Sequence, residues 1–503
     1  MKSSSSDTFM KLQETAAFKT TYAIEEPYVY VAIAEDQDSK EIRYRVIEPS
    51  MEPPEKALLD RIKKILIEEM NIPVSNLSTA GTGKVLEDEV ARVIKEYKIK
   101  LEPGVMNKIL YYVKRDFLGY ERIDCMMRDH LIEDVSCDGV GVPIYIWHRE
   151  YESIPTNVMF DTAEELNRFV VRLAYKCGKH ISFATPILDG SLPDGSRANA
   201  TYGSEISTKG TTFTIRRFKA DPLTVVDLMD LKTISADVAA FLWYAVENKS
   251  SILVAGGVAS GKTTILNGLL MFIRPDLKIV SIEETPEINI PHTNWVSMTT
   301  RMGFGSRGTE ISLFDLLKNS LRQRPDYIIV GEVRGAEAYT LFQALATGHG
   351  VCATIHADSP ASVIKRLEAK PLNVPRPLIG LVDLILIQNR IRVGNKSMRR
   401  TMDVTEVKGY DAEKDELVMR QRVRWDPVTD TQEMSDKSYL LQKLADKNGL
   451  SLETVTKEIL KRKTILKWLQ KKGMRRYMEL DSVLREYYSD PENVYRRAMV
   501  ESV

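Results

Sequence analysis

The sequence predicts an α/β protein whose second half is built on a mostly parallel β-sheet. From about residue 225 to residue 400, short apolar segments alternate with helical segments, which is the pattern of strands joined by crossover helices. A glycine-rich loop follows the first apolar segment directly and opens a helical one. The best strand candidates are SILVAGG, DLKIVSIEE, DYIIVGEV and GVCATIHA.

The chain has 503 residues, which is more than one hydrophobic core usually serves, so several domains are expected. Changes of pattern predict an N-terminal α+β and helical domain, a small α/β domain, a linker, the parallel-sheet core and a mostly helical C-terminal extension. Their boundaries are 1–119, 120–219, 220–224, 225–400 and 401–503. The linker is placed there because Pro222 restrains the residue before it.

Shorter patterns fill in these domains. YVYVAIA and EIRYRVI predict a hairpin over 27–47, and PIYIWH predicts a strand. SLPDGSRANATYG and TTFTIRRF resemble a turn-rich strand pair, and AEELNRFVVRLAYKC has the apolar spacing of an amphipathic helix. A loop is expected at 78–84, and a charged strand-like stretch after 400. Further helices are predicted at 57–70, 87–97, 103–118, 451–472 and 478–488.

Composition narrows the function classes. The 70 basic residues balance 70 acidic ones, so no overall charge favours nucleic acid or an anionic surface. The four cysteines are far apart and form no C-x-x-C pair, which predicts neither a zinc site nor a disulfide framework and fits a reducing compartment. No stretch approaches about 18 uninterrupted apolar residues, and the polar start lacks a signal-peptide core. We expect a protein that does not span a membrane.

The glycine-rich loop fits the phosphate-binding pattern G-x-x-x-x-G-K-[ST], with an apolar strand before it and a helix after it. Its glycines let backbone N–H groups turn toward phosphate oxygens at a helix N-terminus. Lys262 is expected to reach the β- and γ-phosphates of ATP, and Thr263 to hold Mg²⁺. The predicted binding residues are Gly256, Gly257, Val258, Ala259, Ser260, Gly261, Lys262, Thr263 and Thr264.

Acids follow two later strands, at the edge where such sheets place their chemistry. One strand ends in Glu283, which could orient the attacking water or coordinate Mg²⁺; a solvated acidic loop is the alternative. The strand DYIIV is followed by Glu332, where a Walker-B acid would hold Mg²⁺ directly or through water. The alternative there is an ordinary charged strand end.

Three of the six histidines, His292, His349 and His356, fall in the parallel-sheet segment. His349 precedes a predicted strand, and His356 ends that strand on the phosphate side, so His356 is a candidate catalytic residue. A structural role is the alternative for both, and the spacing required for zinc is missing.

With these motifs in order, the sequence resembles the ATPases of type II secretion, type IV pili and the archaellum. The four boxes of that family are present as GGVASGKT, VSIEETPE, IIVGEVRGAE and TGHGVCATIHA, and the resemblance covers about residues 120–400. The segments MRDHLIEDVSCDGVGVPIYIWHREY, LPDGSRANATYG and HTNW are similar to the archaeal branch, and the zinc module of bacterial members is missing. Two positions depart from the family pattern, Glu284 and Gly335, each where an Asp is usual.

The resemblance implies a homohexamer in which ATP binds between a PAS-like domain and a RecA-like domain. It implies that Glu283 is the catalytic glutamate and Glu332 the Walker-B acid. It also places Arg197 and either Arg216 or Arg217 near the phosphates, where a guanidinium can neutralise charge on the transferred group.

The predicted function is therefore ATP hydrolysis that powers protein secretion or assembly of a pilus-like or archaellum-like filament. The implied cofactors are ATP and Mg²⁺. The implied partner is a polytopic membrane platform protein, with the ATPase docked at the cytoplasmic membrane face. Two rivals stay open: a RecA-like motor that moves nucleic acid, which the missing basic groove disfavours, and a nucleotide-gated adaptor that does not hydrolyse ATP.

The C-terminal segment 457–476 holds nine Lys and Arg residues. Val455, Ile459, Leu466 and Leu469 form an apolar stripe at helical spacing beneath them. A solvated helix face is the simpler interpretation, and docking to an acidic loop or an anionic lipid is the alternative.

Overall fold

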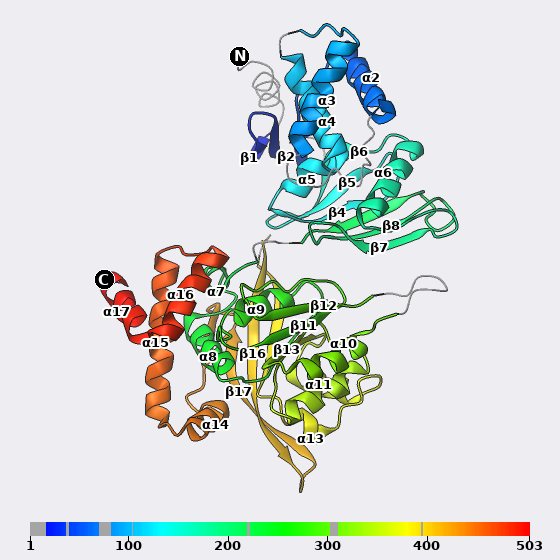
Figure 1. Cartoon of the computed structure of the whole chain (residues 1–503). Coiled ribbons are helices and arrows are strands. Elements are labelled where there is room, and N and C mark those ends of the chain that lie inside the picture. Colours follow the sequence, from blue (N-terminus) through cyan, green and yellow to red (C-terminus); the bar gives the residue numbers. More distant parts are fainter. Residues whose placement is uncertain are drawn as a thin grey trace. The chain divides into compact units, whose positions relative to one another are not determined.

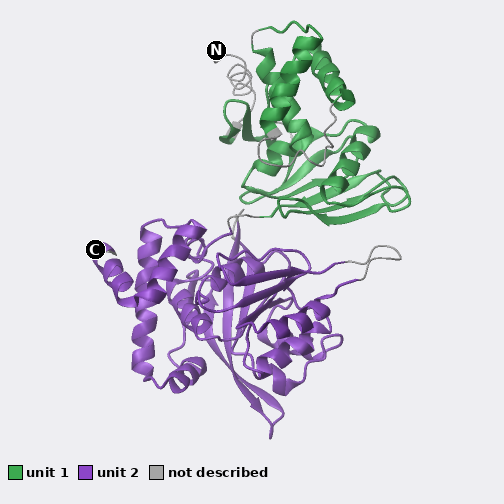
Figure 2. Cartoon of the chain, in the orientation of Figure 1, with its two compact units in different colours: residues 1–218 green, residues 219–503 purple. Residues whose placement is uncertain are grey.

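The structure is a computed structural model that describes residues 17–36, 40–69, 82–102, 104–218, 222–301, 310–393 and 396–502. The chain folds into two compact units, residues 1–218 and 219–503 (Figure 2). The predicted loop at 78–84 and the linker at 220–224 lie partly outside the described residues. The finer boundaries at 119 and 400 stay predictions.

The described strands of the first unit form one nine-stranded sheet in the order β1-β2-β3-β6-β5-β4-β9-β8-β7. The strands β3 and β6 pair in parallel, and the other neighbouring strands pair antiparallel. The strands are β1 Ala17–Glu25, β2 Val29–Glu35, β3 Ile42–Ile47, β4 Ile132–Cys137, β5 Pro143–His148, β6 Glu152–Met159, β7 Ile187–Ser191, β8 Arg197–Thr201 and β9 Thr212–Arg216.

Two groups of helices accompany this sheet (Figure 1). The helices α2, α3 and α4 share a small apolar core of their own, and α6 packs its apolar face on the sheet. The helix α6 begins at a Thr162 cap, whose side chain accepts from the Glu165 N–H. The helices are α2 Pro53–Glu69, α3 Thr82–Glu96, α4 Val105–Phe117, η2 Glu121–Ile123, α5 Asp124–Arg128 and α6 Ala163–Lys176.

The described strands of the second unit form another nine-stranded sheet, in the order β12-β11-β13-β14-β10-β15-β16-β17-β18. The pairs from β12 to β15 are parallel, and those from β15 to β18 are antiparallel. The strands are β10 Ile252–Gly256, β11 Ile279–Glu283, β12 Trp295–Thr299, β13 Tyr327–Val330, β14 Gly350–Ile355, β15 Leu384–Val393, β16 Lys396–Asp411, β17 Glu416–Asp426 and β18 Thr431–Met434.

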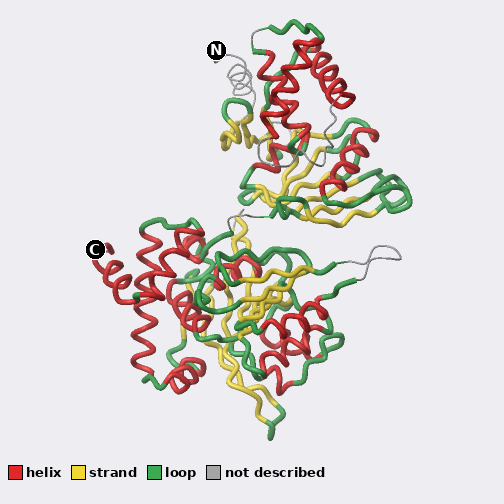
Figure 3. The backbone as a smooth tube through the Cα atoms, in the orientation of Figure 1, coloured by secondary structure: helices red, strands yellow, loops and turns green. Residues whose placement is uncertain are grey.

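The parallel part of this sheet confirms the predicted fold class. Strand β10, which precedes the glycine-rich loop, and strand β13, which precedes Glu332, are separated by one strand, β14, as in RecA-like sheets. Helices cover both faces of the sheet (Figure 3). They are α7 Val225–Asp230, α8 Ala236–Glu247, α9 Lys262–Leu270, α10 Leu313–Ser320, η4 Leu321–Gln323, α11 Glu337–Ala346, α12 Pro360–Glu368, α13 Arg376–Ile379, α14 Tyr439–Asn448, α15 Leu452–Lys471, α16 Tyr477–Ser489 and α17 Pro491–Ser502.

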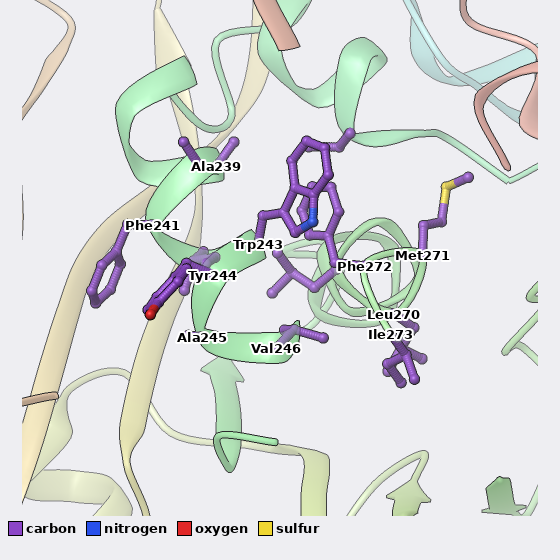
Figure 4. Close-up of a cluster of buried hydrophobic side chains, with 14 of the residues drawn as sticks. Ala239, Phe241, Trp243, Tyr244, Ala245, Val246, Leu270, Met271, Phe272 and Ile273 are labelled. Atoms are coloured by element: carbon purple, nitrogen blue, oxygen red, sulfur yellow. The ribbon is translucent and has the colours of Figure 1, made fainter. Parts of the chain in front are cut away.

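The apolar core on the α8 and α9 side fixes the phosphate-loop helix in place. Trp243 of α8 and Phe272, just after α9, stack with ring centroids 5.0 Å apart and planes 2° apart (Figure 4). The indole N–H of Trp243 donates to the Tyr488 hydroxyl on α16, which in turn donates to the Phe272 carbonyl. Tyr488 of the C-terminal helices thus holds both α8 and the end of α9.

The basic segment 457–476 is mostly a neutralised helix surface. Its apolar stripe faces the core: Val455, Leu466 and Leu469 are buried. Several of its cations pair with acids of the same unit, such as Lys463 with Asp237 at 2.5 Å. Arg462 differs from the other basic residues of this helix because it is buried, with 3% of its surface exposed. Among the described residues, no helix has the length and apolar character needed to cross a bilayer.

Candidate nucleotide-binding site

The glycine-rich loop joins β10 to α9, as the motif predicts. Ala259 and Gly261 have positive φ angles of 57° and 88°, which turn the chain back on itself just before the helix begins. Only glycine adopts this conformation without strain, so Gly261 suits the last turn of the loop. Gly256 has no room for a side chain, because a Cβ there would lie 2.3 Å from the Gln388 carbonyl oxygen.

Lys262 extends across this loop. Its Nζ atom donates to the carbonyl oxygens of Gly256 and Gly257 at 3.1 and 2.9 Å, and lies 3.4 Å from Nδ1 of His356. The residue is 9% exposed. A positive charge is therefore held inside the loop at the N-terminus of α9, where both the helix dipole and the ammonium favour an anion.

Glu332, the predicted Walker-B acid, is linked to this lysine through His356. Nε2 of His356 is 3.3 Å from Oε1 of Glu332, so Lys262, His356 and Glu332 form a continuous polar chain. Burial alone would raise the pKa of Glu332, but hydrogen bonds and charge from Arg334, together with His356 and Lys262, hold it below its ordinary value. Partial burial and the Lys262 ammonium lower the pKa of His356, which favours a neutral imidazole at pH 7.

Arg334 links Glu332, which follows β13, to Glu284, which follows β11, and the sequence did not predict this contact. Its guanidinium donates to both carboxylate oxygens of Glu332, at 2.6 and 2.8 Å, and to Glu284 at 2.9 Å. The only sequence signal was its place two residues after the Walker-B acid. This pairing also gives Glu284, one of the two departures from the family pattern, a defined role as a partner of Arg334.

Glu283 is the most perturbed acid of the site. It is 2% exposed and packs against Gly331, the neighbour of Glu332. Oε1 accepts from the N–H groups of Glu287 and Ile288 at 2.9 and 3.0 Å, whereas Oε2 has no hydrogen-bond partner among the described residues. Burial raises the pKa of Glu283 to about 7, although the two backbone donors lower it. Such a carboxyl can exchange a proton near neutral pH.

The second departure from the family pattern, Gly335, lies in a tight turn. Oε1 of Glu337 accepts from the N–H groups of Arg334 and Gly335 at 2.7 and 2.8 Å. A Cβ at Gly335 would lie 3.0 Å from the other carboxylate oxygen of Glu337. The turn after Glu332 is thus fixed by the first residue of α11, which supports the position of Arg334.

The other histidines are separate from the polar chain. His349 lies 3.0 Å from the Thr347 hydroxyl and 3.1 Å from the Ala344 carbonyl, which ties the turn before β14. Nε2 of His292 lies 2.6 Å from the Leu277 carbonyl. Of the three histidines singled out in the sequence, His356 is the one placed beside Lys262 and Glu332.

The predicted arginines all belong to the first unit. Arg197 on β8 and Arg216 on β9 are directly opposite each other, and Arg197 makes a two-pronged ion pair with Asp189 at 2.9 and 2.7 Å. Arg217 instead donates to the carbonyl oxygens of Asp129 and Ile132, a contact typical of a structural residue. Arg197 and Arg216 therefore fit the proposed phosphate role better than Arg217, and for all three that role stays a prediction.

Comparison with known proteins identifies the family. The model of the type II/IV secretion system protein family matches residues 132–463, and that of the PilB3-like C-terminal family matches residues 428–502. The uncharacterized protein MJ0900 of Methanocaldococcus jannaschii is 36% identical over 453 residues, which cover 86% of this chain and 82% of that protein. The conjugal transfer protein TrbB of Rhizobium radiobacter is 35% identical over 235 residues, covering 45% and 69%.

Among solved structures, the pilus retraction motor PilT with bound ADP is 17% identical and covers 73% of this chain and 93% of its own, with a TM-score of 0.39. The VirB11 ATPase of the Brucella suis type IV secretion system is 24% identical and covers 55% and 89%, with a TM-score of 0.29. The family model covers well over half of the sequence. The chain belongs to the type II/IV secretion system protein family.

Proposed function

We propose that the chain is an ATPase that binds Mg-ATP on the loop from Gly256 to Thr263 and hydrolyses it to power protein secretion or assembly of a pilus-like or archaellum-like filament. The observation that carries this proposal is the convergence of Lys262, His356 and Glu332 at one edge of the parallel sheet, with Glu283 packed beside them. These groups are the parts that phosphoryl transfer needs.

Each residue has a distinct task in this proposal. The loop N–H groups and Lys262 bind the phosphates, and Thr263 and Glu332 would hold Mg²⁺, which neutralises charge on the phosphate oxygens. A hydroxyl and a carboxylate are ligands that suit this cation. Because Arg334 pairs with both Glu332 oxygens, metal and guanidinium compete for the same carboxylate. The Oε2 atom of Glu283 accepts the proton of the attacking water.

The first test is direct. Lys262→Ala should abolish phosphate release from Mg-ATP and weaken Mg-ATP binding about ten- to a hundredfold, the value of a lost charge-assisted contact. Phosphate release and calorimetric titration measure the two effects. Lys249→Ala, at a partly buried lysine of the same unit that pairs with Asp326, is the control and should behave as wild type. Full turnover by Lys262→Ala would remove the phosphate loop from the mechanism.

The same proposal extends to assembly: six copies form a ring, the ring docks on a membrane platform protein, and Arg197 and Arg216 stabilise the transferred phosphoryl group. Membership of the secretion family supports the assembly, and the strand pair β8–β9 supports the arginine role because Arg197 and Arg216 lie directly opposite each other on it. Arginines supplied in this way are worth about 10³–10⁵ in rate in other P-loop enzymes, and two that share the role should each be worth less.

Arg197→Ala and Arg216→Ala are therefore expected to lower turnover much more than Mg-ATP affinity. Turnover per chain should also rise with protein concentration over the range where light scattering shows hexamers forming. Arg217→Ala is not a suitable control, because that side chain holds backbone carbonyls inside the first unit. Constant turnover per chain across assembly, with both variants fully active, would rule out the ring mechanism and leave the ATPase proposal standing.

A further inference from the structure

We propose that Arg399, together with Arg390, is a second phosphate-binding element of the nucleotide site, and that it contacts the α- and β-phosphates rather than the γ-phosphate. This inference rests on the proposed ATPase function and deepens it. The element would bind nucleoside diphosphates and nucleoside triphosphates equally.

The first observation is the position of the hairpin formed by β15 and β16. Strand β15 pairs with the phosphate-loop strand β10 from Ile252 to Gly256, whose partner is Gln388, and then continues beyond it to Val393. The chain returns as β16. The hairpin thus extends past the strand end from which the phosphate loop starts.

The second observation is a direct contact with the loop. A Cβ placed on Gly261 would lie 3.6 Å from Cγ and 4.0 Å from Cβ of Arg399. The aliphatic stem of Arg399 therefore rests on the last loop residue before α9. A guanidinium on a stem of this length reaches a phosphate held at the same helix N-terminus.

The third observation is that two guanidinium groups lie on one face of this hairpin. Arg390 and Arg399 are directly opposite each other on the two antiparallel strands, so their side chains leave the same face of the hairpin. Like charges in this position are destabilising. Among the described residues, no ion pair joins Arg399 to an acid. A bound phosphate would offset the repulsion and accept hydrogen bonds from both groups.

The order of the strands assigns the phosphates. Glu283, Glu332 and His356 come from β11, β13 and β14 or from the residues that follow them, on one side of β10, whereas β15 lies on its other side. A nucleotide that crosses the loop with its γ-phosphate toward the acids therefore has its nucleoside end toward the hairpin. Arg399 lies at that end, so it would contact the phosphates that ADP and ATP share.

The test compares charge with packing at one position. Arg399→Met keeps the stem that lies on Gly261 and removes the charge, and Arg399→Lys keeps a charge. Arg424→Met is the matched control, because Arg424 is an exposed arginine two strands away from β15 in the same sheet. The full-length proteins are titrated calorimetrically with Mg-ADP and with the non-hydrolysed Mg-AMP-PNP.

We expect Arg399→Met to weaken Mg-ADP and Mg-AMP-PNP binding equally, by about tenfold or more. Arg399→Lys should retain most of the affinity, and Arg424→Met should match wild type. Wild-type affinity should also fall more steeply with salt than that of Arg399→Met. Binding of Mg-ADP by Arg399→Met at wild-type strength overturns the inference, as does a loss confined to Mg-AMP-PNP. A wild-type protein that binds no nucleotide would instead refute the proposed function itself.

Discussion

Glu283→Gln should lower ATP turnover by about 10²–10⁴-fold, the usual contribution of a general base, while Mg-ATP still binds. The amide has nearly the same shape as the carboxyl. It keeps an oxygen that can accept from the N–H groups of Glu287 and Ile288, so the loop after β11 should stay in place. What it loses is the ability of Oε2 to take a proton, and that atom has no other partner among the described residues.

The pKa of Glu283 gives this prediction a pH dependence. Burial raises it to about 7, so the carboxyl is protonated below that pH and cannot accept a proton from water. Wild-type turnover should therefore rise as the pH increases through about 7. The protonated form also favours the folded state, and this contribution to stability is lost as the pH rises from the ordinary value of 4.5 to about 7.

The measurement is the pH profile of turnover at saturating Mg-ATP, alongside calorimetric Mg-ATP affinity. Glu413→Gln is the control: it alters an exposed acid of the same unit, in the turn between β16 and β17. It should keep the rise in turnover near pH 7. Normal hydrolysis by Glu283→Gln would place the base elsewhere, with Glu284 and Glu287 as the next candidates.

The parallel sheet, and the edge of it that carries the candidate site, could be predicted because short local sequence patterns identify both. Each core strand is a short apolar segment, and its length and composition identify it without a partner. The motif residues come directly after these strands. Because parallel strands end at the same edge of the sheet, the motif residues lie together at that edge. That is why Lys262, Glu332 and His356 meet as a polar chain, although Lys262 and His356 are 94 residues apart in the chain.

What sequence could not show depends on pairing over long distances. Strand β1 was missed, because its lysine, threonines and glutamate resemble a polar loop until β2 pairs with it. The first sheet joins Tyr44 to Thr156 across the predicted boundary at 119, and β16 runs through the one at 400. Arg334 and Arg399 were not singled out, because their significance lies in which side chain they meet.

Arg462 shows the same limit at the C-terminus, where the sequence predicts one more exposed cation of a basic helix. Its Nε and Nη2 atoms donate to one oxygen of Glu247 at 3.1 and 2.8 Å. Its guanidinium lies 5.1 and 5.2 Å from the ring centres of Tyr244 and Tyr487. The partner is 215 residues away in the chain, so no helical pattern could reveal it.

Arg462→Met should lower the free energy of unfolding of the second unit by about 3 kcal/mol, the lower end of the cost of breaking a buried ion pair. The lower end applies because the Glu247 side chain is 18% exposed and water can screen it in part. The substitution leaves Glu247 without its cation at the last residue of α8, where the helix dipole also disfavours a negative charge.

Urea unfolding, followed by fluorescence of Trp243 and Trp468 in the same core, measures the loss. Lys467→Met changes an exposed lysine of the same helix and should leave stability unchanged.

The double variant Arg462→Met with Glu247→Leu removes both charges and should recover much of the loss, because an apolar pair can replace a buried ion pair. Equal stability of the single variant and wild type would show that the pair contributes nothing. A double variant no better than the single would assign the loss to packing against Tyr244 and Tyr487. Because α8 braces the end of α9 through Trp243 and Phe272, a loosened C-terminal helix should also weaken Mg-ATP binding, which links this buried arginine to the phosphate loop.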